Sequence, residues 1–322
     1  MRIAVTGSIA TDHVMTFPGR IADQLLADHL DHVSLSFLVD GLEIRDGGVA
    51  ANIAYGLAGL GHRPLLVGAA GADFRDHGAR LSGRGVDISG VRLSATRPTA
   101  RFLCTTDPHG NQVASFHPGA MAEASDIDLA EVVRRCGGAD LVLVGADHPS
   151  AMLRHTRACR DGHIPFVADP SRQVARFDGA DLGGLVDGAA CLFTDEHQRG
   201  LLLARTGWTE TEVLRRTDTW VTTLGEKGCR IDRAGWPTVR VPAVTAPRVV
   251  DATGAGAAFR AGYLASLAEG LDPERCAQQG AALAALALSA VGTQTYDFAP
   301  DDLPALLSAA YGTSAVAPAR PT

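Results

Sequence analysis

Residues 251–262, DATGAGAAFRAG, combine the end of a strand, a glycine-rich turn and the start of a helix. Because Gly254 and Gly256 carry no side chains, consecutive backbone N–H groups can converge on an anion, and the positive end of the helix points to the same place. The pattern predicts a phosphate-binding turn; a tight packing turn is the alternative. Ala257 stands where transfer chemistry on a hydroxyl needs a proton acceptor, and its methyl group cannot accept a proton.

Three other segments have the composition of a ligand site. DGGVAAN (46–52) is a second glycine turn that enters a helix, with Asn52 one turn inside. DPSRQ (169–173) and TLGEKG (223–228) each follow a strand-like apolar run. Together with the turn at 254–256, they predict that several strand ends contribute to one binding site.

The order of these motifs, GG-x-x-x-N, DPS, TLG-x-KG and D-x-TGAG-x-x-F-x-AG, resembles the ribokinase (PfkB) family of carbohydrate and nucleoside kinases. The resemblance runs from residue 2 to about 293, and the segments AVTGSIATDH, SFLVD, GAAGADF and TARF look most like the actinobacterial adenosine kinases of that family. It implies an α/β fold with three layers, α/β/α, whose central sheet is mostly parallel. It also implies a small β lid, formed by residues 10–46 and 95–118 of a domain that covers 1–311.

The resemblance assigns a nucleoside pocket. Asp12 corresponds to a carboxylate that accepts hydrogen bonds from two neighbouring ribose hydroxyls. Phe102 and Phe116 correspond to an aromatic pair that encloses a purine, and such stacking contributes about 1–3 kcal/mol per base. Ordinary packing within the lid is the alternative for this pair. The residues expected to bind substrate are Ser8, Asp12, Gly47, Gly48, Asn52, Phe102, Phe116 and Gln173.

The phosphoryl-transfer positions depart from the family pattern. The family has an Asp base after TGAG, where this chain has Ala257, and a positioned base contributes about 10²–10⁴-fold to the rate. The family motif N-x-x-E, which organises Mg²⁺ and phosphate through water, aligns with residues 195–198. Gln198 lacks the charge that would hold hydrated Mg²⁺, and Asp195 adds a charge that repels a triphosphate. The residues expected to bind the anion or nucleotide are Asp195, Gln198, Thr223, Gly225, Gly228, Gly254, Ala255 and Gly256.

ATP and Mg²⁺ are the cofactors that the resemblance implies, and these three changes weaken that expectation; no metal held by the protein alone is predicted. An engineered removal of the base would explain Ala257 only, so natural divergence fits three changes better. The remaining catalytic candidates beside Ala257 are Asp251, Thr253 and Arg172. Further acid–base groups are Glu196, His117, His148 and His197, for which partly exposed loop positions are the alternative.

Three functions follow from this pattern. The first is an enzyme that binds an adenosine-like nucleoside or nucleotide, has lost or weakened ATP-dependent 5′-phosphorylation, and acts otherwise at the 5′ position, for example by removing or replacing a phosphate. The second is an adenosine kinase whose base has been replaced by Ala257. The third is a nucleoside sensor without catalysis.

The elements that position these residues alternate along the chain. Apolar strands are predicted at 2–8, 64–71, 140–147, 165–171, 190–195 and 219–225, with helices at 49–61, 150–162 and 209–217. Strands that are apolar throughout and separated by helices predict a parallel sheet that is covered on both faces. Two hairpins, at 33–48 with a turn at Asp40-Gly41 and at 99–121, predict a separate small sheet, and residues 312–322 are predicted to be a flexible tail.

Composition limits the partners. The 322 residues are 46% hydrophobic and carry a net charge of −7, which argues against a general nucleic-acid or anionic-membrane binder. No apolar run is long enough to span a membrane, and the amino terminus has no secretion-signal pattern, so a cytoplasmic protein is predicted. The six cysteines are scattered and are expected to be free thiols. The resemblance further implies a homodimer joined through the β lid.

Overall fold

The computed structural model describes residues 1–24 and 34–312; the expected tail lies outside the described residues except for Gly312. Nine strands form the central sheet in the order β13-β12-β11-β10-β9-β8-β1-β4-β5, with parallel pairing from β5 to β11 and antiparallel pairing at β12 and β13. The predicted mostly parallel sheet is confirmed. Its strands are β1 (Ile3–Thr6), β4 (Leu65–Ala70), β5 (Asp87–Leu93), β8 (Leu141–Val144), β9 (Phe166–Ala168), β10 (Cys191–Asp195), β11 (Trp220–Thr223), β12 (Cys229–Asp232) and β13 (Val239–Val241).

Helices cover both faces of this sheet. Alternate residues of a strand face opposite sides, and accordingly Ile3 and Val5 of β1 belong to one buried core while Ala4 belongs to the other. The first core contains residues of α1 (Val49–Gly59), α2 (Arg75–Arg84), α8 (Ala255–Ala268), α9 (Pro273–Ala287) and α10 (Asp302–Tyr311). The second contains residues of α3 (Leu129–Arg135), α4 (Pro149–Asp161), α5 (Gly179–Val186), α6 (Glu196–Thr206) and α7 (Glu210–Leu214).

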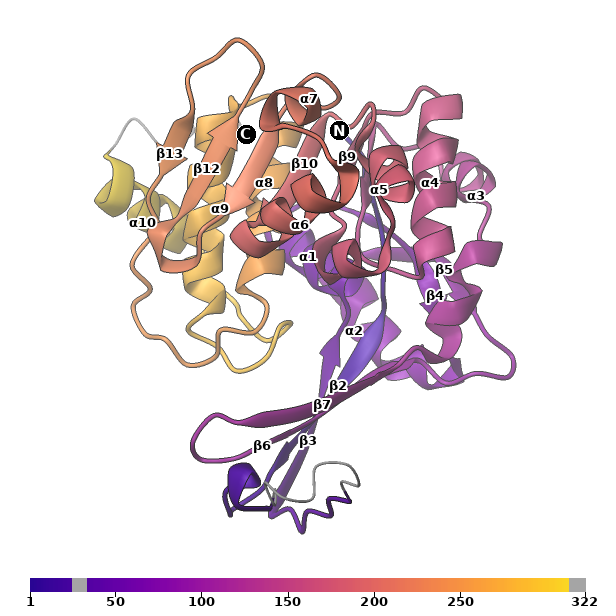
Figure 1. The fold of residues 1–322 in the computed structure, drawn as a ribbon, viewed down its shortest axis with the longest axis vertical. Coiled ribbons are helices and arrows are strands. Elements are labelled where there is room, and N and C mark those ends of the chain that lie inside the picture. The colour runs from indigo at the N-terminus through magenta and orange to yellow at the C-terminus, as the bar shows by residue number, and fades with distance from the viewer. Residues whose placement is uncertain (25–33, 313–322) are drawn as a thin grey trace.

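A second sheet of four strands projects from the body of the molecule (Figure 1). Its order is β3-β2-β6-β7, and its strands are β2 (Ala10–Thr16), β3 (Gly41–Gly47), β6 (Ala100–Thr106) and β7 (Gln112–His117). The predicted hairpin around residues 107–111 is confirmed by the antiparallel pairing of β6 with β7. We call these four strands the small sheet.

The hairpin predicted within residues 33–48 is wrong. Among the described residues of that stretch, 34–39 form no strand, and β3 pairs with β2 over seven consecutive residue pairs, from Ala10 opposite Gly47 to Thr16 opposite Gly41. Phe37 instead packs its ring against Phe17, with 5.0 Å between the ring centroids. The pattern in the sequence identified a strand correctly but assigned it the wrong partner, because strand pairing depends on segments that are distant in the chain.

The predicted strands and helices that frame the site are confirmed. The six apolar runs correspond to β1, β4, β8, β9, β10 and β11, and the three helical stretches correspond to α1, α4 and α7. The carboxyl ends of parallel strands meet at one edge of the sheet, which is where ligands bind in folds of this type. Within the described residues, no helix has the length and apolar character needed to cross a membrane.

Candidate active site between the small sheet and the glycine turn

Four side chains form one row across the small sheet. Asp12 in β2 lies opposite Arg45 in β3 and opposite Phe102 in β6, and Phe102 lies opposite Phe116 in β7. Directly paired residues place their side chains on the same face, so the four form a continuous surface. His117 follows Phe116 on the strand, so its side chain faces the other side of the small sheet. The prediction that His117 is an acid–base group of the site is therefore wrong.

A cavity of about 200 Å³ lies between this row and two loops of the body. It brings together Asp12, Phe102, Asp251 and Thr253, which the sequence analysis had assigned to one site. Phe116 does not line this first cavity in the described structure and is 47% exposed. The lining residues of the first cavity are Asp12, Val14, Arg45, Phe102, Cys104, Gln112, Asp251, Thr253, Gly292 and Thr293.

Two glycines leave room for the Asp12 carboxyl group and for the backbone that precedes it. An added Cβ on Gly47 would stand 2.7 Å from Asp12 Oδ2, and one on Gly48, whose φ is +98°, would stand 2.5 Å from the Ser8 carbonyl oxygen. Both glycines are therefore needed for close packing, which is how the expected glycine motif contributes to the site. Burial raises the pKa of Asp12 to about 6; Arg45 opposes this shift and Asp251 adds to it.

The Asn52 side chain is oriented by Thr293, which lines the first cavity, and by the next residue, Gln294. Its Oδ1 accepts hydrogen bonds from Thr293 Oγ1 and from Gln294 Nε2, both at 2.8 Å. The acceptor atom is therefore occupied, and Asn52 itself lines neither cavity in the described structure. Ser8 has a structural role, because its Oγ accepts a hydrogen bond from the Val49 amide at the start of α1 at 3.0 Å.

The glycine turn is anchored from below by a buried ion pair. Gly254 has a φ of +90°, and α8 begins at the next residue. Arg260 Nη1 donates to the Gly256 carbonyl oxygen at 3.0 Å, and Arg260 Nη2 donates to Asp169 Oδ1 at 2.8 Å. Asp169 follows β9 and is 1% exposed. The ion pair therefore fixes the turn relative to the centre of the sheet. Ala257, the third residue of α8, is half-buried.

Asp195 and Gln198 form one structural unit at the start of α6. Asp195 Oδ1 accepts a hydrogen bond from the Gln198 amide at 2.7 Å, and Gln198 Oε1 accepts one from the Asp195 amide at 3.0 Å. This reciprocal pair is a capping box, which satisfies two backbone donors at the helix start. Compared with the family pattern, the single carboxylate has moved from the fourth position to the first, so the charge of the pair is unchanged.

A second and larger cavity, of about 730 Å³, lies on the other side of the turn. Its volume falls within the range of small-molecule sites, roughly 300–1,000 Å³. Most of its lining is apolar, and Thr223 at its edge lies opposite Asp195 in the pairing of β10 with β11. The expected residues Thr223, Gly225, Gly228, Ala255 and Gly256 all line this second cavity.

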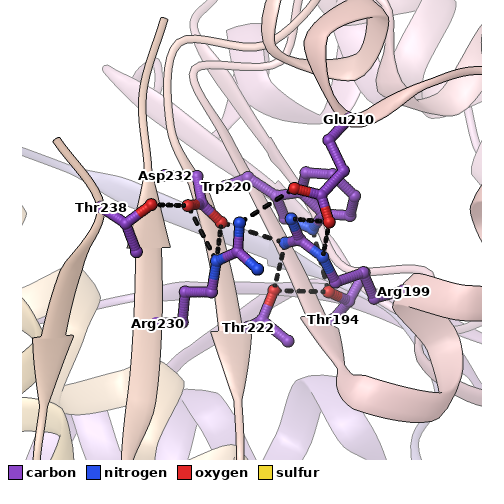
Figure 2. Close-up of polar contacts among 8 residues, drawn as sticks. All are labelled: Thr194, Arg199, Glu210, Trp220, Thr222, Arg230, Asp232 and Thr238. Carbon is purple, nitrogen blue, oxygen red and sulfur yellow. Dashed lines mark hydrogen bonds and ion pairs between the residues drawn. The ribbon is translucent and has the colours of Figure 1, made fainter. Parts of the chain in front are cut away.

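A charged network joins α6 to two strands of the central sheet. Figure 2 shows Arg199 lying over the Trp220 ring, 3.6 Å from its centroid, and donating to Thr222 and Asp232. Arg199 is 7% exposed and Asp232 is 3% exposed, so the pair is nearly dry. The network joins the helix that carries the capping box to β11 and β12. The other residues of the network are Thr194, Glu210, Arg230 and Thr238.

Some expected residues lie apart from both cavities. Arg172 is exposed and lines neither cavity among the described residues, and His197 is exposed on α6. Gln173 Nε2 donates to the Asp147 carbonyl oxygen at 2.9 Å. Gln173 Oε1 and His148 Nδ1 are buried with no hydrogen-bond partner among the described residues.

Arg45 and Thr293 line the first cavity and were not predicted from the sequence; Asp147, which was not predicted either, lines neither cavity in the described structure. Burial raises the pKa of Asp147 to about 7, against the effect of the His148 amide, and Asp147 Oδ2 has no hydrogen-bond partner in the described part of the chain. Its position at a strand end was visible in the sequence. Arg45 could have been found from the alternation along β3, but only with the correct pairing to β2. Thr293 carried no local signal.

Comparison with known proteins identifies the family. Residues 5–300 match the pfkB family of carbohydrate kinases, which covers most of the chain. The protein belongs to the pfkB family. Among curated pfkB relatives, a nucleoside kinase of Methanocaldococcus jannaschii is 27% identical over 251 residues, which are 77% of this chain and 81% of that protein.

Solved structures agree with the pfkB assignment. A nucleoside kinase of Burkholderia thailandensis in complex with inosine is 33% identical, with a TM-score of 0.86 over 96% of this chain and 98% of that one. The same kinase in complex with ADP-inosine gives a TM-score of 0.83, with coverage of 96% of both chains. Arabidopsis thaliana ribokinase with ribose and ATP gives 0.75 over 95% of this chain and 98% of that one, at 22% identity, and shows the shared fold. The expected ribokinase-like fold with its small β sheet is thereby confirmed.

Proposed function

We propose that this pfkB protein binds a purine nucleoside of the adenosine type in the first cavity and acts at its 5′ position. The observation that carries the proposal is the shared cavity of Asp12, Phe102, Asp251 and Thr253 beside the glycine turn. Asp12 accepts hydrogen bonds from ribose hydroxyls, and the purine stacks on Phe102. The nucleoside complexes of the Burkholderia thailandensis kinase support a nucleoside as ligand.

The second cavity is where ATP fits best. Its apolar lining suits an adenine ring, and the amides of Ala255 and Gly256 adjoin it at the start of α8, where an anion is stabilised. When bound, ATP supplies the transferable phosphoryl group and Mg²⁺ neutralises its charge. Asp195 is the carboxylate that would hold the ion together with phosphate oxygens, since Mg²⁺ needs few protein ligands in such sites. A neighbour in complex with ADP-inosine supports this assignment.

Ala257 makes the proposed transfer slow. A 5′-hydroxyl that attacks a phosphorus atom must lose its proton, and position 257 provides no acceptor. The retained amides at 254–256 would still stabilise an anionic 5′ group. We therefore propose that ATP-dependent 5′-phosphorylation is weak. We also propose that the site is suited to substrates that already carry an anionic 5′ group, and that the reaction removes this group or replaces it with another nucleophile, such as water.

An adenosine kinase whose base has been replaced by Ala257 is the second candidate, and two observations favour it. The second cavity is present, and the capping box of Asp195 and Gln198 keeps one carboxylate at the motif. The loss of charge expected at Gln198 is therefore balanced by the gain at Asp195, and Ala257 remains as the one uncompensated change at the transfer positions named above.

Calorimetry with adenosine, followed by an assay of ADP formation, tests these proposals. The first proposal expects adenosine binding with slow ADP formation, and faster chemistry on a 5′-phosphorylated nucleoside. Slow ADP formation that becomes fast in Ala257→Asp, with no faster chemistry on a 5′-phosphorylated nucleoside, would instead establish the second candidate. Adenosine binding without turnover of any of these substrates would leave a nucleoside sensor, and no binding of either nucleoside or nucleotide would refute the site.

We also propose a cytoplasmic homodimer joined through the small sheet. The face of the small sheet opposite the ligand row exposes apolar side chains in the monomer: Leu42 is 58% exposed, Ile44 61% and Val113 42%. Apolar side chains gathered on one face are typical of protein interfaces, and a second copy of the same face would cover them.

A further inference from the structure

Arg45 connects the small sheet to the loop that leads into the glycine turn. Its side chain faces the first cavity, and its Nη1 donates to Asp251 Oδ2 at 3.1 Å. Its aliphatic part lies over Gly292, where an added Cβ would stand 3.3 Å from Arg45 Cδ. The two charged side chains are 23% and 17% exposed, so water screens this ion pair only in part.

Asp251 is held by the backbone of both loops that shape the turn. Its Oδ1 accepts a hydrogen bond from the Thr253 amide at 2.8 Å, and its Oδ2 accepts one from the Gly292 amide at 2.9 Å. Burial opposes ionisation of Asp251, but these hydrogen bonds and the Arg45 charge lower its pKa overall. A guanidinium bound to Asp251 therefore acts on the two loops that meet at Gly254, which packs against Thr293.

Arg45 has a second carboxylate partner on its own strand. Glu43 Oε2 accepts a hydrogen bond from Arg45 Nε at 3.0 Å, and Glu43 is 64% exposed. Glu43 and Arg45 are two residues apart in β3, so they share a face and move together. If the small sheet moves away from the body, Arg45 loses Asp251 but keeps Glu43. Because the guanidinium is never left without a counter-ion, the contact with Asp251 can form and break at low cost in free energy.

We propose that Arg45 is a positioning residue that couples closure of the small sheet over the nucleoside to the arrangement of the turn at 254–256. This inference rests on the proposed function, because the nucleoside is the ligand that draws the small sheet toward the turn. A nucleoside bound by Asp12 and Phe102 engages the same row as Arg45, and so holds the guanidinium against Asp251. Because such coupling is reciprocal, the contact with Asp251 also strengthens nucleoside binding.

Hydrogen–deuterium exchange with and without adenosine, together with calorimetry, tests the coupling. In the wild-type protein, adenosine should slow exchange both in the small sheet (10–16 and 41–47) and in residues 251–258. In Arg45→Ala, adenosine should bind about 5-fold more weakly or worse, the lower end of typical coupling between sites. Exchange should still slow in the small sheet but no longer at 251–258. Arg45→Lys, which keeps a charge at this place, should restore part of the effect.

A matched control removes a different ion pair, which joins β3 to α2 through Asp46 and Arg80. Arg80 Nε donates to Asp46 Oδ2 at 2.7 Å at the base of β3, outside the first cavity. Arg80→Ala should loosen the base of the small sheet and still show slower exchange at 251–258 with adenosine. If Arg45→Ala melts far below wild type, Arg45→Met keeps the length of the side chain and carries the same expectations.

The outcomes separate this inference from the proposed function. If adenosine protects residues 251–258 equally in Arg45→Ala and in wild type, the coupling is refuted while nucleoside binding stands. If the wild-type protein does not bind adenosine, the proposed function is refuted. Hydrogen exchange of the ligand-free proteins then tests whether Arg45 influences the turn at 254–256. Faster exchange at 251–258 in ligand-free Arg45→Ala would support a contact that shapes the turn, whereas equal exchange would refute that as well.

Discussion

Replacing Ala257 with aspartate is the most direct test of how this protein works. Ala257 is the third residue of α8, lies in the first turn of that helix, and is half-buried rather than fully enclosed. A carboxylate in the first turn interacts favourably with the helix dipole, by about 0.3–1 kcal/mol. We therefore expect Ala257→Asp to fold with a melting temperature equal to or slightly above that of wild type.

The same substitution should restore a base for the 5′-hydroxyl. A positioned base contributes about 10²–10⁴-fold to the rate. At about 1.4 kcal/mol per factor of ten, this corresponds to roughly 3–5 kcal/mol of activation free energy. The assay is formation of ADP from adenosine and ATP with Mg²⁺, measured at saturating nucleoside so that the change appears in kcat. The adenosine affinity should change little, because Ala257 does not line the first cavity in the described structure.

Ala257→Asn is the matched control, because asparagine has the shape of aspartate but cannot act as the base. Ala257→Asn should leave ADP formation at the wild-type level. The reasoning is refuted if Ala257→Asp folds, binds adenosine and ATP, and still forms ADP no faster than wild type. In that case the 5′-hydroxyl does not approach residue 257, and the assignment of the glycine turn as the transfer site fails.

A pH titration and three substitutions test the nucleoside pocket and the support of the turn. At pH values below about 6, the affinity of the wild-type protein for adenosine should decrease by roughly tenfold per pH unit. The reason is that the pKa of Asp12 is raised to about 6, so the carboxylate that accepts the hydrogen bonds becomes protonated there. Calorimetry from pH 5 to 8 measures this decrease. Phe102→Ala should weaken adenosine binding by about 1–3 kcal/mol, the value of one stacked base, and Phe116→Ala by less because Phe116 is 47% exposed. Asp169→Asn should lower the free energy of unfolding by about 3–5 kcal/mol, since it leaves the buried Arg260 charge unpaired, as urea titration would show.

Each of these expectations has a contradicting result. For the pH dependence, Asp12→Asn should bind weakly at every pH, and a wild-type affinity that does not change between pH 5 and 7 would refute the role of Asp12. Equal losses from Phe102→Ala and Phe116→Ala would place the purine elsewhere on the small sheet. A loss below about 1 kcal/mol in Asp169→Asn would mean that the pair is solvated like a surface ion pair.

The raised pKa of Asp12 also affects stability. Its folded-state pKa of about 6 lies above the ordinary value of 3.8, so the folded protein holds the proton more tightly. The contribution of Asp12 to the free energy of unfolding is therefore fully present at pH values below its ordinary pKa of 3.8, and it is lost as the pH rises through about 6. Ligand binding and stability thus respond to Asp12 in opposite directions, which is typical of a functional group kept in an unfavourable environment.

Local patterns determined much of this protein. A parallel sheet that is covered on both faces requires strands that are apolar throughout, and those runs placed β1, β4 and β8 to β11 correctly. The glycine turn at 254–256 was visible because only glycine tolerates both the positive φ and the close packing at Gly254. The motif order was enough to indicate the family. The spacing of Asp195 and Gln198 also obeys the local rule for a capping box, which explains why they act as one unit.

The tertiary structure alone decided which distant groups meet. The pairing of β3 with β2, rather than with residues 34–39, places Arg45 beside Asp12, and the packing of the small sheet against the body places it against Asp251, 206 residues away. The buried partner of Arg260 is likewise 91 residues distant. Such contacts result from the packing of whole elements, which no short window of sequence contains. The sequence therefore determined the glycine turn and the alanine at position 257, and the fold decided which charged residues contact the loops around that turn.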